Sequence, residues 1–171
     1  MYRHLPTLGR RWVVRTIAPS YTVGAMGIIE RADGALLLVR HVYRRHWGVP
    51  GGLLQRGEAP EEAVRREVLE EVGLRVTLVG EPTVVVDPEP QRVDIVFRAN
   101  PATDTDASRV EPSSEEIIET RWFLPGELPE LQHETAGALI ALARASRTPP
   151  GHRLAGAWLE PEHHERRVDS A

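Results

Sequence analysis

Residues 52–74 read GLLQRGEAPEEAVRREVLEEVGL and contain the clearest helix of the chain. Pro60 suits the first helical position, two glutamates follow it in the first turn, and Gly73 is typical of a residue that ends a helix. Three valines recur every four residues and mark the face that packs against a core: Val64, Val68 and Val72. The pattern therefore predicts an amphipathic helix that follows a glycine-rich loop.

Three glutamates of this helix, Glu67, Glu70 and Glu71, fall on one arc of the helical wheel beside the valine stripe. Like charges at this spacing repel each other, and partial burial beside a core increases the cost. A solvated acidic face is the simpler interpretation. The alternative is a bound cation, and oxygen ligands without cysteine indicate Mg²⁺ or Mn²⁺ rather than zinc.

The residues around the helix favour the bound cation. The loop WGVPGG at residues 47–52 leads toward the helix, and Glu58 stands just before it. Arg66 lies outside the glutamate arc of the wheel, so it can pair with Glu58 and tie the loop to the helix.

Strand-like runs dominate the rest of the chain. Residues 21–29 precede a predicted hairpin turn at Asp33-Gly34, which leads into an apolar run at 35–39. The other expected elements are strands at 75–79, 83–86, 92–99 and 117–123, a polar loop at 100–114 and a helix at 133–145. Because strands outnumber helices and do not alternate with them, the pattern predicts an α/β (α+β) sandwich and not a doubly wound parallel sheet.

The length of 171 residues favours a single domain, which we expect at residues 21–146. Residues 1–20, which include a β-prone stretch at 11–17, are expected to form an N-terminal extension. Residues 147–171, rich in proline, histidine and charge, are expected to form a C-terminal extension.

The chain has no cysteine and no lysine, and all 21 of its lysine and arginine positions are arginine. Disulfides, thiolate metal sites and catalytic lysines are therefore excluded, whereas arginine leaves phosphate binding open. The net charge of −4 gives no general attraction to nucleic acid, which is not an expected partner. Because the chain shows neither an apolar run near ~18 residues nor a signal-peptide pattern, we expect a cytoplasmic protein without a membrane partner.

Residues 52–74 resemble the signature of the Nudix hydrolases at every defining position. Gly52 is followed after five residues by Glu58 and, after seven more, by REVLEEVGL at residues 66–74. The wider likeness in strand pattern extends over residues 20–145. The resemblance implies a Nudix-type α/β/α sandwich with a mixed sheet and a loop-helix-loop metal site.

The same resemblance implies roles for the signature residues. Glu67, Glu70 and Glu71 would be ligands of Mg²⁺ or Mn²⁺, with the carbonyl group of Gly52 as a further ligand. Glu58 and Arg66 would form a structural ion pair.

The implied reaction is attack of water on a phosphorus atom of a nucleoside diphosphate that is linked to another group. ADP-ribose, a nucleotide sugar or a nucleoside triphosphate would be such a substrate. In this family the general base is a glutamate of the signature helix or of a distant loop. Glu70 is the candidate in the helix, and the distant candidates are Glu115, Glu116 and Glu119. We favour Glu116, which directly precedes a predicted strand.

The sequence indicates the substrate-binding residues less clearly than the metal ligands. Arg40, Arg44 and Arg45, with His41 and His46, precede the glycine loop. They can reach a phosphate or a terminal ribose, or they form a solvated or interface-facing basic strand end. Trp47 can stack on a base or be buried against the core. Pro90, which follows the signature at a distance typical of ADP-ribose hydrolases in the family, favours that substrate.

A nucleotide-sensing module that binds without hydrolysis is the alternative function. Family members that only bind usually lose signature glutamates, and this chain retains all of them, which favours hydrolysis. An isopentenyl diphosphate isomerase, also known in this family, needs a catalytic cysteine and is excluded. A homodimer, common among relatives, is compatible with the sequence.

Overall fold

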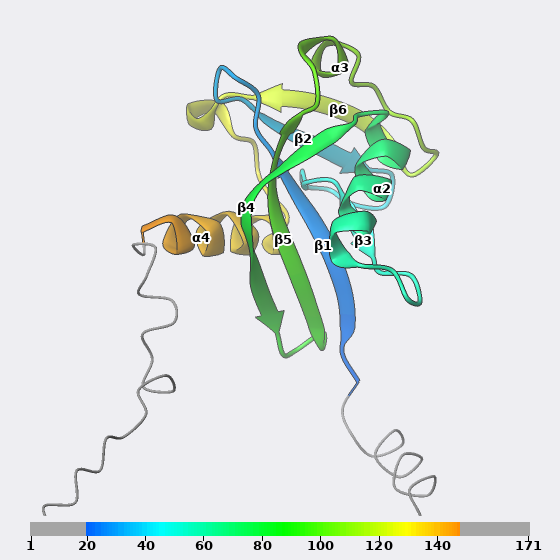
Figure 1. The fold of residues 1–171 in the computed structure, drawn as a ribbon, viewed down its shortest axis with the longest axis vertical. Coiled ribbons are helices and arrows are strands. Elements are labelled where there is room, and N and C mark those ends of the chain that lie inside the picture. The colour runs from blue at the N-terminus through cyan, green and yellow to red at the C-terminus, as the bar shows by residue number, and fades with distance from the viewer. Residues whose placement is uncertain (1–19, 148–171) are drawn as a thin grey trace, which may run out of the picture.

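A computed structural model describes residues 20–147 of the chain (Figure 1). Along the chain the elements are β1 (Thr22–Ile29), β2 (Leu36–His41), β3 (Gly51–Leu53), α2 (Pro60–Val72), β4 (Val76–Asp87), β5 (Arg92–Pro101), α3 (Asp104–Ser108), β6 (Ile117–Phe123), the 3-10 helix η1 (Pro125–Glu127) and α4 (His133–Arg147). The predicted β-prone stretch at 11–17 and nearly all of both predicted extensions lie outside the described residues. Within residues 20–147, no helix is long and apolar enough to cross a membrane.

The strands form two sheets. The larger sheet has the order β3-β1-β5-β4, in which β1 and β5 are parallel and the two outer pairs are antiparallel. The smaller sheet consists of β2 and β6, which are antiparallel. The predicted mixed α/β fold is therefore confirmed.

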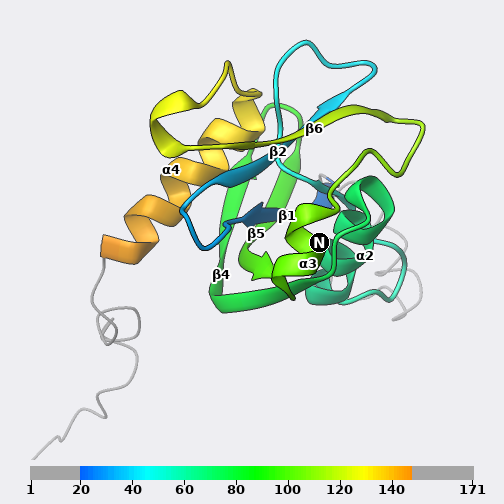
Figure 2. The same cartoon turned by 90° about the horizontal axis from the view of Figure 1, so that it is seen from above.

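Helices α2 and α4 lie on opposite sides of the larger sheet (Figures 1 and 2). The alternation of side chains along β1 explains why both helices find an apolar surface. Ala25 and Ile29 belong to the core under α2, whereas Met26 and Ile28 belong to the core shared with α4. Two hydrophobic cores on one sheet give the three layers of an α/β/α sandwich.

Helix α2 has the ends that its sequence predicts. It begins at Pro60, and the carboxylate of Glu62 accepts a hydrogen bond of 3.2 Å from the backbone N–H of Ala59. Gly73 ends the helix with a φ of 65°, and its N–H donates to the carbonyl of Leu69. The three valines of the predicted stripe, Val64, Val68 and Val72, are fully buried. Each contributes about 1.5–3 kcal/mol through burial.

Four local expectations differ from the structure. The turn at Asp33-Gly34 forms, but among the described residues one bridge, between Glu30 just after β1 and Leu36, is all that joins the two sides of the turn, and β2 pairs with β6. The two strands expected at 75–79 and 83–86 are one strand, β4, whose register shifts between Val79 and Thr83. The loop expected at 100–114 contains the short helix α3, because the side chain of Thr103 caps its N-terminus.

The fourth difference is that the glycine loop contains strand β3. A side chain at Gly51 would overlap the backbone of Ala25 in β1, and the φ of Gly51 is 154°. Glycine therefore permits the close pairing between β3 and β1 that sets the position of the loop against α2.

Candidate active site

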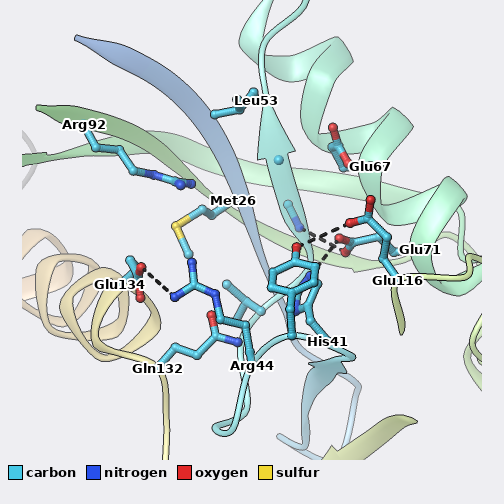
Figure 3. Close-up of a pocket in the computed structure, with 14 residues that line it drawn as sticks. Met26, His41, Arg44, Leu53, Glu67, Glu71, Arg92, Glu116, Gln132 and Glu134 are labelled. Atoms are coloured by element: carbon cyan, nitrogen blue, oxygen red, sulfur yellow. Dashed lines mark hydrogen bonds and ion pairs between the residues drawn. The ribbon is translucent and has the colours of Figure 1, made fainter. Parts of the chain in front are cut away.

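A pocket of about 410 Å³ lies where the glycine loop, α2 and the start of α4 meet (Figure 3). Acidic side chains gather at one end, where Glu67, Glu71 and Glu116 are labelled in Figure 3. Arginine, glutamine and a further glutamate gather at the other end. The lining residues are Met26, His41, Tyr43, Arg44, Val49, Gly51, Gly52, Leu53, Glu67, Glu71, Arg92, Glu116, Gln132 and Glu134.

Glu71 is a buried carboxylate at the acidic end, with 7% of the residue exposed. Its Oε1 atom lies 3.3 Å from Nε2 of His41, and its Oε2 atom accepts a 3.2 Å hydrogen bond from the N–H of Gly51. Burial raises the pKa of Glu71, although both contacts favour the charged form. A buried carboxylate with so few partners is suited to bind a cation.

Glu67 lies against the backbone of Gly52. A Cβ atom at residue 52 would overlap the carboxylate of Glu67, so a glycine here permits the carboxylate to approach the backbone this closely. The carboxylate also accepts a 2.7 Å hydrogen bond from Nη1 of Arg66. Gly52 and Glu67 both line the pocket, on the side of β3.

Glu58 and Arg66 form a bidentate ion pair. Nε of Arg66 donates to Oε1 of Glu58 at 2.7 Å, and Nη2 donates to Oε2 at 3.0 Å. Nη2 of Arg66 also donates to the carbonyl of Leu53 at 3.3 Å. The hydrogen bonds from Arg66 lower the pKa of Glu58 to about 2. This pair therefore ties the loop that follows β3 to helix α2.

Glu70 differs from the other two glutamates of the helix. Its side chain is 57% exposed, accepts a 3.2 Å hydrogen bond from Nη1 of Arg66 and does not line the pocket. Among residues 20–147, no three His, Asp or Glu side chains form a group that could hold a metal ion by themselves. Mg²⁺ is commonly held by one or two carboxylates together with substrate phosphates. The oxygen donors of Glu67 and Glu71 fit that mode of binding.

Glu116, which directly precedes β6, reaches the acidic end of the pocket from the opposite part of the chain. The hydroxyl group of Tyr43 donates to its Oε2 atom at 3.3 Å. Burial and the charge of Glu116 raise the pKa of Tyr43, which therefore stays a hydrogen-bond donor. The structure thus brings Glu116 to the same pocket as Glu67 and Glu71.

Of the four predicted substrate-binding residues, only Arg44 lines the pocket, with its Nη1 atom 3.5 Å from Oε1 of Glu134. Arg40 is paired with Glu119 at 2.7 Å and lies over the ring of Trp47. The ring of Trp47 packs edge-on against Phe123, with 5.0 Å between ring centroids, in the core beneath α4. Trp47 is thus partly buried against this core, and both Trp47 and Arg45 lie outside the pocket lining.

Sequence reasoning missed five residues of the lining, namely Met26, Tyr43, Arg92, Gln132 and Glu134. They come from β1, the chain after β2, β5 and the region where α4 begins. No short motif links them, because only the pairing of β1 with β5 and the packing of α4 bring them together. The single available signal was the presence of charged and polar residues at the ends of predicted elements.

Comparisons with known proteins agree with the observed fold. A family model described as the NUDIX domain matches residues 20–143. The chain is 35% identical to a MutT-like protein of Streptomyces ambofaciens over 119 residues, which cover 70% of this chain and 74% of that protein. A NUDIX hydrolase structure from Nitrosomonas europaea superposes with a TM-score of 0.64 at 25% identity, over 77% of this chain and 76% of that one. A MutT NUDIX hydrolase structure from Burkholderia pseudomallei superposes with a TM-score of 0.59 at 28% identity, over 72% of this chain and 99% of that one.

Proposed function

This chain belongs to the Nudix hydrolase family, and from that premise we propose that it is a Mg²⁺- or Mn²⁺-dependent pyrophosphohydrolase. Its substrate is a nucleoside diphosphate linked to another group, and water attacks one of the two phosphorus atoms. The observation that carries the proposal is the convergence of Glu67, Glu71 and Glu116 at one end of a single pocket.

Glu67 and Glu71 are the residues that would hold the metal ion, and the carbonyl group of Gly52, which lines the same pocket, is a further candidate ligand. When bound, the ion would supply neutralisation of the diphosphate charge and activation of water. The N–H of Gly51 and the ring of His41 orient the carboxylate of Glu71. Arg66 orients Glu67 and draws Glu70 toward the same guanidinium, so Glu70 would join the ligands only after its contact with Arg66 is released.

Glu116 is our candidate for the general base that accepts a proton from the attacking water. It lines the pocket beside the proposed metal ligands, whereas Glu70 does not. Tyr43 holds one oxygen of Glu116, which leaves the other oxygen to accept a proton.

The test is a hydrolysis panel on the purified chain with Mg²⁺, with Mn²⁺ and with EDTA. The panel contains ADP-ribose, a nucleotide sugar, a dinucleoside polyphosphate, GTP and ATP. We expect metal-dependent release of a nucleoside monophosphate from at least one substrate. Glu71→Gln should lower that rate by more than about 100-fold, because loss of a ligand exceeds the 10–100-fold cost of losing one of its supporting partners.

Glu61→Gln is the matched control, since Glu61 is an exposed glutamate in the first turn of the same helix. Its rate should equal that of the unaltered chain. Binding of the product to Glu71→Gln, measured by calorimetry, separates loss of catalysis from loss of the pocket. Tight nucleotide binding without hydrolysis of any substrate by the unaltered chain would contradict the proposal and support a nucleotide sensor.

A further inference from the structure

We propose that Arg92 is a specificity-determining residue that reads a carbonyl-bearing nucleobase at the end of the pocket opposite the carboxylates. The inference rests on the proposed function, because it assigns the nucleotide end of the same substrate. It commits to a nucleobase such as guanine, rather than to a further phosphate group or to adenine, the base of the ADP-ribose that Pro90 led us to expect.

The guanidinium of Arg92 is held in place by an ion pair with Asp94. Its Nε atom donates to both carboxylate oxygens of Asp94, at 2.9 and 2.8 Å. Asp94 is buried, with 5% of the residue exposed, so the pair is partly shielded from solvent. Within residues 20–147, no hydrogen bond is formed by Nη1 or Nη2 of Arg92. These two nitrogens therefore present a fixed pair of donors to the pocket, into which Arg92 points in Figure 3.

Gly24 in β1 makes room for this arrangement. Its register partner in β5 is Asp94, and a Cβ atom at residue 24 would overlap Oδ1 of Asp94 and lie 3.0 Å from Nη2 of Arg92. Any larger residue would push the pair out of position. The strand pairing of β1 with β5 thus fixes where the guanidinium lies.

The charges at this end of the pocket balance one another. Arg92 is paired with Asp94, and Arg44 lies 3.5 Å from Glu134. The hydrogen bond and charge of Asp94 raise the pKa of Arg92, and the charge of Glu134 adds to this effect. Two arginines and two carboxylates sum to zero formal charge. A neutral ligand suits such a site better than an additional phosphate, which would leave it with excess negative charge.

A neutral ligand here must both accept and donate hydrogen bonds. Arg92 offers donors only, whereas Glu134 offers acceptors. Gln132 lines the pocket and donates through Nε2 to the carbonyl of His46 at 3.0 Å, so its Oε1 atom remains as an acceptor. Met26 lies between the two arginines in Figure 3 and offers a polarisable surface to a flat ring.

A nucleobase with a ring carbonyl next to N–H groups satisfies both demands. Arginine pairs bidentately with the O6 and N7 atoms of guanine, and a carboxylate accepts from ring or amino N–H groups. Adenine places an amino group where guanine has O6, so it would face the donors of Arg92 with a donor. The pocket should therefore favour guanine over adenine.

The experiment measures binding of GMP and of AMP by calorimetry in the absence of metal, so its readout does not depend on hydrolysis. We expect the unaltered chain to bind GMP at least about tenfold more tightly than AMP, in the range of discrimination of one bidentate pair. Arg92→Lys, which keeps a positive charge beside Asp94 but loses the paired donors, should remove most of this difference. Gly24→Ala should act in the same direction, because it displaces the pair without changing any charge.

Arg98→Met is the matched control, since Arg98 lies on the same strand, is paired with Glu30 and does not line the pocket. Its preference for GMP should be unchanged. In steady-state hydrolysis, Arg92→Lys should raise KM for GTP with little change in kcat. Equal loss of GMP and AMP affinity in Arg92→Lys, or a matching loss for inorganic pyrophosphate, would overturn the base assignment. If the unaltered chain preferred GMP over AMP but hydrolysed no substrate of the panel, only the proposed function would be overturned.

Discussion

Nε2 of His41 lies 3.3 Å from Oε1 of Glu71, and both side chains are about nine-tenths buried. His41 ends β2 and Glu71 belongs to the last turn of α2, so this contact joins the smaller sheet to the proposed metal-binding helix. Nδ1 of His41 is buried without a hydrogen-bond partner among the described residues. The histidine is therefore held by packing and by Glu71 alone, which makes it a positioning residue for that carboxylate.

His41→Phe should weaken metal binding without creating a cavity in the core. The ring volume is retained, but Glu71 keeps only the N–H of Gly51 as a partner. We expect Mn²⁺ affinity, measured by electron paramagnetic resonance, to fall by about 10–100-fold. The free energy of unfolding, measured with urea, should fall by about 1–3 kcal/mol because the buried carboxylate of Glu71 is left incompletely paired. Unchanged Mn²⁺ affinity alongside that loss of stability would show that His41 is merely structural.

Gly52→Ala should reduce hydrolysis while the chain remains folded. The added Cβ atom would overlap the carboxylate of Glu67, whose far end can rotate away. The substitution should therefore displace the carboxylate of a proposed metal ligand without unfolding the chain. We expect kcat to drop by about tenfold or more, as it does when a metal ligand loses its orientation. Gly57→Ala is the control for glycine substitution in the same loop, because a Cβ atom at residue 57 meets no atom within 4 Å, although its φ of +83° adds strain. Equal rates for the two variants would contradict the steric argument.

The ion pair of Glu58 and Arg66 predicts a specific dependence of stability on pH. Hydrogen bonds from Arg66 lower the pKa of Glu58 from 4.5 to about 2 in the folded chain. As the pH falls below about 4.5, the unfolded chain takes up this proton first, so the contribution of Glu58 to stability declines and is lost near pH 2. Above that window the contribution is fully present.

Glu58→Gln should therefore be less stable than the unaltered chain at pH 7, and the difference should shrink between pH 4.5 and pH 2. Urea unfolding at a series of pH values measures this difference. The control is Glu62→Gln. Glu62 is an exposed glutamate four residues away, and its carboxylate accepts a hydrogen bond from the backbone N–H of Ala59 at the start of α2. A difference that stays constant with pH would exclude Glu58 as its source.

Trp47 should matter for stability and not for substrate binding. Its ring packs against Phe123 in the core beneath α4, outside the pocket lining. Trp47→Ala should lower the free energy of unfolding by about 3–5 kcal/mol, the usual cost of removing a large aromatic side chain from a core. Trp47→Phe should leave KM within a factor of two, since one apolar ring replaces another. A large increase in KM for Trp47→Phe would restore the stacking interpretation.

The sequence predicted the parts of the site that lie within one short segment. Residues 52–74 contain the helix, its ends and the pairing of Glu58 with Arg66, because spacing along a helix determines which side chains are neighbours. The same reasoning failed for Arg92 and Glu134. Their proximity depends on the register of β5 against β1 and on where α4 crosses the sheet, and neither is encoded in local spacing.

Trp47 and Arg40 were expected at the pocket and lie outside its lining. Trp47 begins the glycine loop and Arg40 precedes it in the sequence, which suggested both as substrate ligands. Strand β2, however, pairs with β6 in a separate sheet, and this pairing directs Arg40 toward Glu119 and away from the pocket. Nearness in sequence was informative only where one regular element connected the residues.

The final prediction concerns the general base. Glu116→Gln keeps the acceptor for Tyr43 but cannot accept a proton, so kcat should fall by about 10²–10⁴-fold while KM changes little. Tyr43→Phe removes only the hydrogen bond that holds Glu116, and it should lower kcat by a smaller factor. Glu115→Gln, one residue earlier and outside the pocket lining, is the control and should be fully active. If Glu70→Gln rather than Glu116→Gln abolished turnover while Mn²⁺ affinity stayed normal, the base would be in α2. The contact of Glu70 with Arg66 would then have to open during the reaction.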